Sequence, residues 1–415
     1  MLPRLRNRAT FFLRLIQPFL RFFRLEAAGG VLLFFAAVSA LILANSSLTG
    51  WYSKLLTSHI AIGAGRWGMG RSVHFWINDA GMTLFFLLVG LEIKREVIWG
   101  ELASLRSALL PLLAALGGVV TPALIYYALN HSRVTARGWG VPIATDVAFS
   151  LAILASFGKR IPAGLKVFLA AFAIVDDIAG VLVIAFAYTS TLHLEMIAFA
   201  GLCLGLCVAA NIAGITRLWI YLVPSVLLWV CLLYSGIHPT LAGLLIAFVV
   251  PGGELVEGKR TQGKPLYCLE RWIHPFVVFG IVPLFAFVNA GIPVRGIQRT
   301  DFLHPVFMGV YCGLLFGKPL GISLFAWLAV RMRVAQLPFG TTWRSLFAVS
   351  CLGGIGFTIS IFIAGLAFGD ARFYLVARMA ILFASTTSAL VGAILLLRTG
   401  REQPYSNDCG ALLKR

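Results

Sequence analysis

Apolar runs of about twenty residues recur along almost the whole chain, separated by short polar turns. A helix needs about twenty apolar residues to cross the hydrocarbon core of a bilayer, where backbone polar groups must be hydrogen-bonded within the protein. Charged residues make up only 12% of the 415 residues, whereas soluble proteins contain about 25%. The sequence therefore predicts an all-α polytopic membrane protein without a separate soluble domain.

We expect about twelve transmembrane helices, which form a transmembrane domain over residues 29–398. A basic N-terminal tail, 1–28, precedes this domain, and a C-terminal tail, 399–415, follows it. The predicted spans are 29–45, 73–97, 108–129, 134–156, 164–188, 193–212, 218–232, 235–250, 273–290, 306–329, 346–368 and 375–397.

Positive charge is distributed unevenly between the two sides of this arrangement. If the N-terminus is cytoplasmic, the tails and turns on that side hold 24 of the 34 Lys and Arg residues, and the other side holds nine. Because Lys and Arg accumulate in cytoplasmic loops, we expect both termini in the cytoplasm. The net charge of +18 then indicates contact with anionic membrane lipids, above all through the N-terminal tail, and no nucleic-acid partner.

Two adjacent carboxylates, Asp176 and Asp177, lie inside the apolar run 168–187. A carboxylate at the bilayer centre costs about 2.5–3.5 kcal/mol on insertion scales, and two neighbouring carboxylates also repel each other. Such a pair can hold a cation between its oxygens or bind protons. We therefore interpret Asp176 and Asp177 as a site where a cation and protons compete.

Two predicted spans contain residues that interrupt a helix. In the fourth span, two glycines and a proline precede Thr145 and Asp146, so the backbone is expected to break there and to face a cavity. In the eleventh span, a second break is expected at Gly353, Gly354 and Gly356. The two breaks occupy corresponding positions if spans 3–5 and 10–12 are inverted-topology repeats, which is typical of transporters with a site at the bilayer midplane. Close helix packing is the alternative explanation for the glycines.

Lys318 is a single cation near the middle of the tenth span. It either forms an ion pair with Asp176 or Asp177, or it compensates the negative C-terminal ends of interrupted helices. Unpaired, this lysine and the three acids would together cost on the order of 10 kcal/mol. We therefore expect Asp146, Asp176, Asp177 and Lys318 to converge.

A set of short segments spread over the chain forms a specific pattern. They are WINDA at 76–80, FFLLVGLEIKRE at 85–96, ATD at 144–146, DD at 176–177, GKPLGISLF at 317–325 and GIGFT at 354–358. With these segments the chain resembles the NhaA family of sodium/proton antiporters from about residue 29 to residue 397. The resemblance implies pH-regulated exchange of cytoplasmic Na⁺ or Li⁺ for external H⁺, which we expect to proceed by alternating access. Because both carboxylates can be protonated while only one cation fits, we expect the exchange to be electrogenic. The resemblance also implies a homodimer in the bacterial inner membrane, without enzymatic activity or a cofactor.

The resemblance assigns roles to the buried charges. Asp177 would be the main ligand of the sodium ion, and Asp176 would share that ion, exchange protons and pair with Lys318. The two interrupted helices would cross next to Thr145 and Asp146. Asp146 would balance the positive N-terminal ends of the half-helices, and Lys318 would balance their negative C-terminal ends.

The resemblance also places a pH-responsive cluster at the cytoplasmic mouth. By sequence alone, residues 92–96 are equally well explained as an ordinary solvated helix end, and a histidine before a proline as a helix cap. The implied cluster consists of Glu92, Arg95, Glu96, Glu270 and His274.

Other positions depart from the family or receive a structural interpretation. Tyr267 and Arg271 stand where well-known members have a lysine and a histidine, so the pH threshold is not carried over. We assign hydrogen-bonding, structural roles to His238 and Asp79. Residues 55–72 match a region where the family forms an extracytoplasmic β-hairpin with dimer contacts, although a Gly-rich loop fits the sequence equally well.

Two other classes of protein fit the sequence less well. An intramembrane aspartyl protease needs its acids on two facing helices, whereas the closest acids here, Asp176 and Asp177, are adjacent on one. A sodium symporter for an organic solute needs polar groups for that solute, and these spans offer little beyond Thr and Ser near the breaks.

Overall fold

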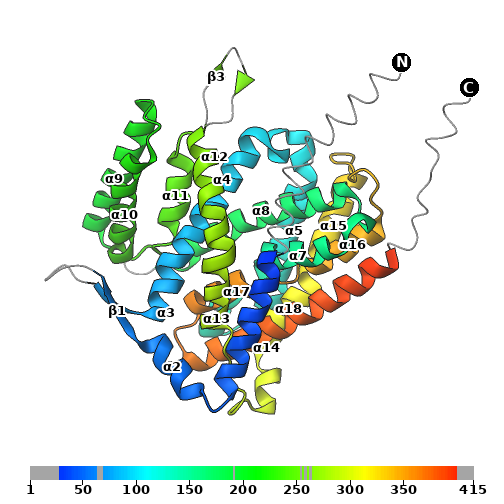
Figure 1. The fold of residues 1–415 in the computed structure, drawn as a ribbon. Helices are drawn as coiled ribbons and strands as arrows, with labels where there is room; N and C mark the ends of the chain where they lie inside the picture. The colour runs from blue at the N-terminus through cyan, green and yellow to red at the C-terminus, as the bar shows by residue number, and fades with distance from the viewer. Residues whose placement is uncertain are drawn as a thin grey trace, which may run out of the picture.

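The computed structural model describes residues 28–62, 69–189, 192–252, 255–256, 259–260 and 264–399. The predicted tails lie outside the described residues, apart from Ala28 and Thr399. Within the described part of the chain, nine helices are long and apolar enough to cross a membrane, or up to eleven if two bent helix pairs are each one span. The prediction of an all-α polytopic membrane protein is therefore confirmed (Figure 1).

The structure does not support the full count of twelve spans. The predicted eighth span, 235–250, contains only α11 (Leu241–Val249), a helix of nine residues. At about 1.5 Å per residue, such a helix is about 14 Å long and covers about half of the hydrocarbon core. The first span is followed by a sharp bend, since the helix Ala28–Ala44 and α2 (Thr49–Thr57) meet at 115°.

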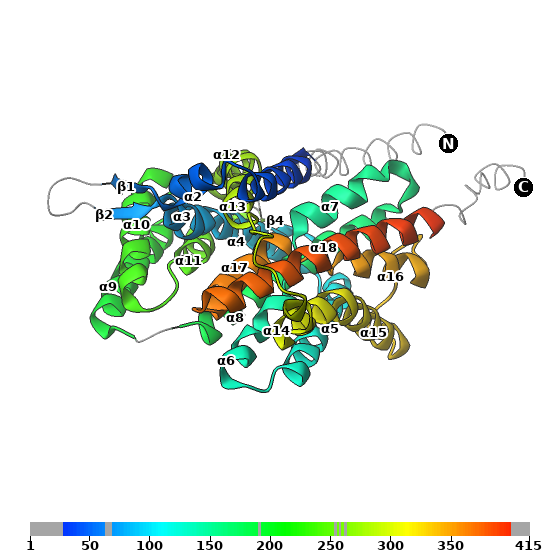
Figure 2. The ribbon, with the colours of Figure 1, turned by 90° about the horizontal axis from the view of Figure 1, so that it is seen from below.

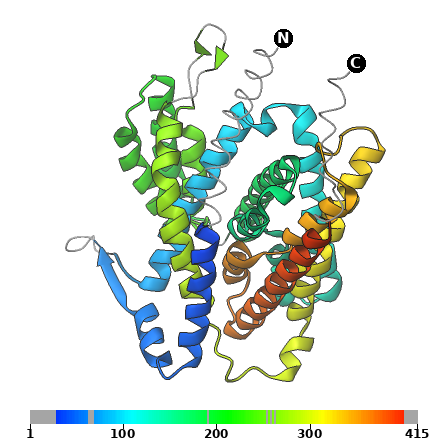
Figure 3. The same ribbon diagram turned by 45° about the vertical axis from the view of Figure 1, so that its right-hand side comes forward.

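The helices form two groups, which lie side by side in Figure 3. In the first group, α4 packs on α11 and α12, and α9 packs on α10. Two π-helical segments, η2 and η6, continue directly into α4 and α13. The elements of this group are α3 (Val73–Phe75), η2 (Trp76–Gly81), α4 (Met82–Trp99), α9 (Leu194–Ile212), α10 (Leu218–Ser235), α11, α12 (Lys264–Phe276), η6 (Val277–Ile281) and α13 (Val282–Asn289).

The second group contains the segments predicted as spans 3–5 and 10–12. Here α5 packs on α15 and α8, while α18 packs on α14, α16 and α17. Its long elements are α5 (Leu105–Leu129), α7 (Val147–Ser156), α8 (Ala163–Ala187), α14 (Pro305–Cys312), α15 (Lys318–Arg331), α16 (Trp343–Leu352), α17 (Phe357–Ala367) and α18 (Ala371–Thr399). Its short elements are α6 (Arg133–Ala136), the 3₁₀ helices η3 (Glu101–Ala103), η4 (Arg137–Ile143), η5 (Gly158–Arg160) and η7 (Arg299–Leu303), and the π-helical η8 (Gly313–Gly317).

The structure also contains two short hairpins. In the region 55–72, β1 (His59–Ile62) pairs antiparallel with β2 (Met69–Ser72), with His59 opposite Ser72. The residues between these two strands lie outside the described part of the chain. The second hairpin pairs β3 (Leu255–Val256) with β4 (Lys259–Arg260) between α11 and α12. Figure 2 shows β1 and β2 at the edge of the helices, and Figure 1 shows β3 above α11 and α12.

Backbone contact between α5 and α15 holds the second group together. A Cβ atom added to Gly117 would lie 2.2 Å from the carbonyl oxygen of Gly321, and one added to Gly321 would lie 2.1 Å from that of Gly117. Small residues allow such close approach of membrane helices. Since Gly321 follows Lys318 by less than one turn, this contact places the lysine against α8, with its Nζ 5.5 Å from the ring centroid of Phe172.

Candidate functional site

The first helix break lies between η4 and α7. The chain leaves helical geometry at Ala144, and α7 begins at Val147 with Asp146 as its N-cap. Asp146 Oδ1 accepts a hydrogen bond of 3.0 Å from the backbone amide of Phe149. A carboxylate is favoured at this position because it binds unpaired amides at the positive end of the helix.

The second break separates α16 from α17, whose axes differ by 48°. Gly353, Gly354 and Gly356 lie in this break, and at least one of them leaves no room for a side chain. A Cβ atom on Gly354 would lie 2.5 Å from the carbonyl oxygen of Leu314 and 2.7 Å from Ser388 Oγ. These glycines therefore do both things that were considered for them: they interrupt the helix, and they allow close packing.

The two breaks are hydrogen-bonded to each other. The amide of Asp146 donates to the carbonyl oxygen of Ile355 at 2.6 Å, and Thr145 Oγ1 donates to that of Gly353 at 2.7 Å. Asp146 Oδ2 accepts from the amide of Thr358 at 3.1 Å and from its hydroxyl at 2.6 Å. One carboxylate thus accepts hydrogen bonds from the first turns of both α7 and α17.

Lys318 forms an ion pair with Asp176. Its Nζ donates to both carboxylate oxygens, at 2.8 Å to Oδ1 and 2.6 Å to Oδ2. Both side chains have 0% exposure, so neither charge is stabilised by water, and removing one partner would leave the other buried and unpaired. Of the alternatives for Lys318, the structure shows the pair with Asp176.

Asp177 has a different environment from its neighbour. It is buried at 6% exposure, and among the described residues no hydrogen-bond donor reaches its Oδ1 atom. The charged groups that interact with it electrostatically are Asp176, Asp146, Glu92 and Lys318. Burial of a carboxylate oxygen without a hydrogen-bond donor is costly unless a cation or a proton binds it. Asp177 Oδ1 is therefore the atom of this site best suited to bind a cation or a proton.

The oxygen-rich composition of the site fits a hard cation. In the described part of the chain, no three His, Cys, Asp or Glu side chains form a cluster that could hold a metal ion. An ion at Asp177 would therefore be held by one or two carboxylates together with hydroxyl groups, backbone carbonyls or water. Such weak, oxygen-only coordination suits an ion that is transported rather than permanently bound.

The predicted pH-responsive residues also meet, at the contact between α4 and α12. The guanidinium of Arg95 pairs with Glu270 Oε1 and, at 3.2 Å, with Glu96 Oε1. Glu92 interacts electrostatically with Arg95, and His274 does so with Glu270. The five residues therefore form one charged cluster in which Glu270 and His274 are buried.

His238 and Asp79, which we interpreted as structural, lie together. Nδ1 of His238 is 2.8 Å from Thr240 Oγ1, and its Nε2 is 3.6 Å from Asp79 Oδ1. The imidazole also makes an edge contact with Phe362 of α17, at 5.3 Å between ring centroids. This pair connects η2 with the segment before α11.

Two serines that were not predicted as site residues support the breaks. Ser150 Oγ donates to the carbonyl oxygen of Leu352 at 2.9 Å, and Ser385 Oγ of α18 accepts from the amide of Phe357 at 3.2 Å. Each satisfies a backbone group that helix interruption leaves unpaired. The available signal for Ser150 was its position one turn after Asp146, but nothing in the local sequence connects Ser385 to a break.

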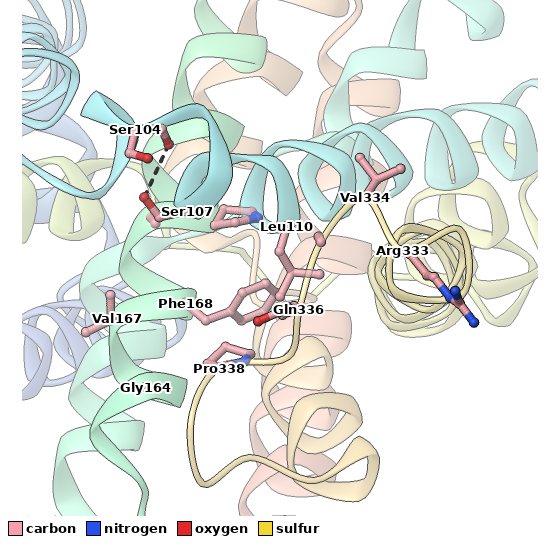
Figure 4. Close-up of a pocket in the computed structure, with 13 residues that line it drawn as sticks. Ser104, Ser107, Leu110, Gly164, Val167, Phe168, Arg333, Val334, Gln336 and Pro338 are labelled. Atoms are coloured by element: carbon pink, nitrogen blue, oxygen red, sulfur yellow. Dashed lines mark hydrogen bonds between the residues drawn. The ribbon is translucent and has the colours of Figure 1, made fainter.

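A cavity of about 540 Å³ lies apart from the charged residues, between the first turns of α5 and α8 and the segment 333–338 (Figure 4). Ser104, Ser107 and Gln336 contribute polar atoms to its lining, while the side chain of Arg333 points away from it. None of the predicted site residues lines this cavity, so it is separate from the ion site.

Comparison with known proteins gives the family. Residues 20–396 match the family Na⁺/H⁺ antiporter 1. The chain belongs to this family. It is 45% identical over 377 residues to the Na(+)/H(+) antiporter NhaA of Escherichia coli O1:K1 / APEC, which covers 90% of the chain and 96% of that relative. It is also 45% identical over 395 residues to NhaA of Rhodospirillum rubrum, with coverage of 94% and 99%.

Membership confirms the resemblance seen in the sequence segments. The chain is thus a transporter rather than an enzyme, and a multi-pass protein of the bacterial inner membrane. The intramembrane protease and the solute symporter are rejected as alternatives, since the family consists of sodium/proton antiporters.

The hydroxyl of Thr358 gives a direct test of the junction between the breaks. Thr358→Ala removes the 2.6 Å hydrogen bond to Asp146, and we expect a loss of about 1.5–3 kcal/mol, typical of a hydrogen bond to a charged group. Thr358→Ser keeps the hydroxyl and serves as the control. Thermal unfolding of the purified variants measures the difference, and equal melting temperatures for the two would contradict the assigned bond.

Proposed function

We propose that the chain exchanges cytoplasmic Na⁺ or Li⁺ for external H⁺ at Asp176 and Asp177 by alternating access. The observation that carries this proposal is the contrast between two adjacent carboxylates. Lys318 neutralises Asp176, whereas Asp177 has an oxygen that no described residue binds. Family membership supports sodium and protons as the exchanged ions.

The ion pair provides a mechanism for exchange. A sodium ion that enters at Asp177 is held more tightly if Asp176 also contributes an oxygen, and for this Asp176 must leave Lys318. When the ion departs, one proton binds Asp177, and a second binds either Asp176 or the amine of Lys318, which then pairs again with Asp176. In the low dielectric of the membrane interior, states with unbalanced charge are strongly disfavoured, so occupancy by the cation and by protons is mutually exclusive.

The same competition makes the exchange electrogenic. Two carboxylates can take up two protons, but the pair has room for one cation, so one net charge crosses the membrane in each cycle. Asp146 remains bound to both half-helices in this scheme and acts as a fixed counter-charge near the exchanging pair. Voltage-independent exchange in reconstituted vesicles would contradict the electrogenic part of the proposal.

The Asp177 assignment predicts a specific loss of function. Asp177→Asn keeps the size of the side chain but removes the charge that binds the cation, and we expect exchange to fall to the background rate. Dequenching of a pH-sensitive dye in everted vesicles, on addition of Na⁺, Li⁺ or K⁺, measures the exchange. Glu195→Gln, at an exposed position in the first turn of α9, is the control. An Asp177→Asn protein with wild-type exchange would refute the site.

We further propose that the cluster around Arg95 and Glu270 sets the response to pH. Glu270→Gln removes the buried partner of Arg95 and should move the pH of half-maximal exchange, while the maximal rate stays within about twofold because the ion site is unchanged. The dye assay over a pH series measures both quantities. A pH profile identical to that of Glu195→Gln would exclude this role for the cluster.

We also propose an orientation of the chain in the membrane and a homodimer. With both termini in the cytoplasm, the β1–β2 hairpin lies on the extracytoplasmic side, where it is available for contacts in a homodimer. The basic N-terminal tail and the cytoplasmic turns then face anionic lipids. Impermeant labelling of the tails from either side tests the orientation, and chemical cross-linking in membranes tests the dimer.

A further inference from the structure

Arg378 is a cation in the third turn of a membrane helix that the proposed mechanism does not use. Its Nη1 donates to the carbonyl oxygen of Asn289 at 2.9 Å, and its guanidinium lies 4.6 Å from the ring centroid of Tyr374. Among the described residues, no carboxylate pairs with it, and no acceptor reaches its buried Nε atom. A charged arginine in a membrane span is costly, and these contacts neutralise little of its charge, so we expect Arg378 to have a function.

Asn289 is the centre of a hydrogen-bonded network around this arginine. Its side-chain amide exchanges two hydrogen bonds with that of Asn78, at 2.8 and 3.2 Å, and it also donates to the carbonyl oxygen of Phe285. Its Oδ1 accepts from the hydroxyl of Tyr374 at 3.3 Å. Asn289 is buried at 1% exposure, so water cannot replace its partners. Its side chain makes all of these hydrogen bonds only while every partner keeps its position.

The network connects the two groups of helices. Asn78 lies in η2 and Asn289 ends α13, so both belong to the first group. Tyr374 and Arg378 lie in α18, which packs on α14, α16 and α17 in the second group. In Figure 1 the beginning of α18 reaches the end of α13. With both termini in the cytoplasm, these ends of η2, α13 and α18 all lie toward the extracytoplasmic side.

We propose that Arg378, Tyr374 and Asn289 form a latch that keeps the extracytoplasmic side closed. This inference rests on the alternating access in the proposed function. The ion site lies in the second group, on α8 and α15 and at the breaks, so outward access requires movement of this group relative to the first. That movement breaks the contacts of α18 with Asn289.

The latch has opposite effects on the two sides of the membrane. A weaker latch increases the population of the outward-open state, which lowers the KM for Na⁺ on the extracytoplasmic side and raises it on the cytoplasmic side. A stronger latch does the reverse. General destabilisation of the fold does not produce changes of opposite sign at the two faces.

Two substitutions weaken the latch by different amounts. Arg378→Gln removes the cation, and Tyr374→Phe removes only the hydroxyl that donates to Asn289 Oδ1. Arg372→Gln is the matched control, because Arg372 belongs to the same helix end but pairs with Asp301 at 2.9 Å instead of Asn289. The backbone amide of Gln298 and this guanidinium lower the pKa of Asp301, so the control also removes a structural charge pair.

The test compares the KM for Na⁺ in right-side-out and everted vesicles at pH 8. For Arg378→Gln we expect the extracytoplasmic KM to fall about fivefold and the cytoplasmic KM to rise, as for the loss of one hydrogen bond. Tyr374→Phe should change both values in the same directions by a smaller factor, and Arg372→Gln should change neither value.

If Arg378→Gln and Tyr374→Phe leave both KM values unchanged, or shift both in the same direction, the latch is overturned. If Arg378→Gln does not accumulate in membranes, Tyr374→Phe weakens the same contact by one hydrogen bond and takes its place. Wild-type protein without sodium/proton exchange would instead refute the proposed function, so the two failures are distinguishable.

Discussion

The cost of charge in a low-dielectric interior determines the arrangement of this protein. Asp146, Asp176 and Lys318 are tolerated because each has a partner: the lysine neutralises Asp176, and the first turns of two interrupted helices bind Asp146. The helix breaks are stable because their free amides and carbonyls form hydrogen bonds with each other and with the side chains of Thr145 and Asp146. Asp177 is the exception, and its unpartnered oxygen is where the account places the transported ion.

The fold class and the charged residues of the site could be predicted because both depend on simple solvation energies. Apolar runs long enough to cross a bilayer identify an all-α membrane protein, and ionised residues inside them stand out. The different roles of Asp176 and Asp177 came only from the resemblance to the antiporter family. The partner of Lys318 was open from the residues themselves, and only the resemblance indicated Asp176, since the pairing depends on the close approach of α5 and α15 through Gly117 and Gly321.

Other features escaped sequence analysis for identifiable reasons. The short α11 has the same apolar composition as a full span, so only the turn at 236–240 shortens it. Ser385 supports a break from a helix distant in sequence, which no local pattern reveals. Arg378 lies inside the predicted span 375–397, but its contact with Asn289 depends on a helix that is distant in sequence. The pH cluster assembles from α4 and α12, and its regulatory role stays a prediction.

The most direct test of the central claim, that sodium and protons compete for the same carboxylates, is the number of protons released when sodium binds. Isothermal titration calorimetry of the purified protein, in buffers with different enthalpies of protonation, gives this number. We expect release of between one and two protons per Na⁺ at pH values where the site is protonated, with an apparent affinity for Na⁺ that weakens as the pH falls. Sodium binding without proton release at any pH would contradict it.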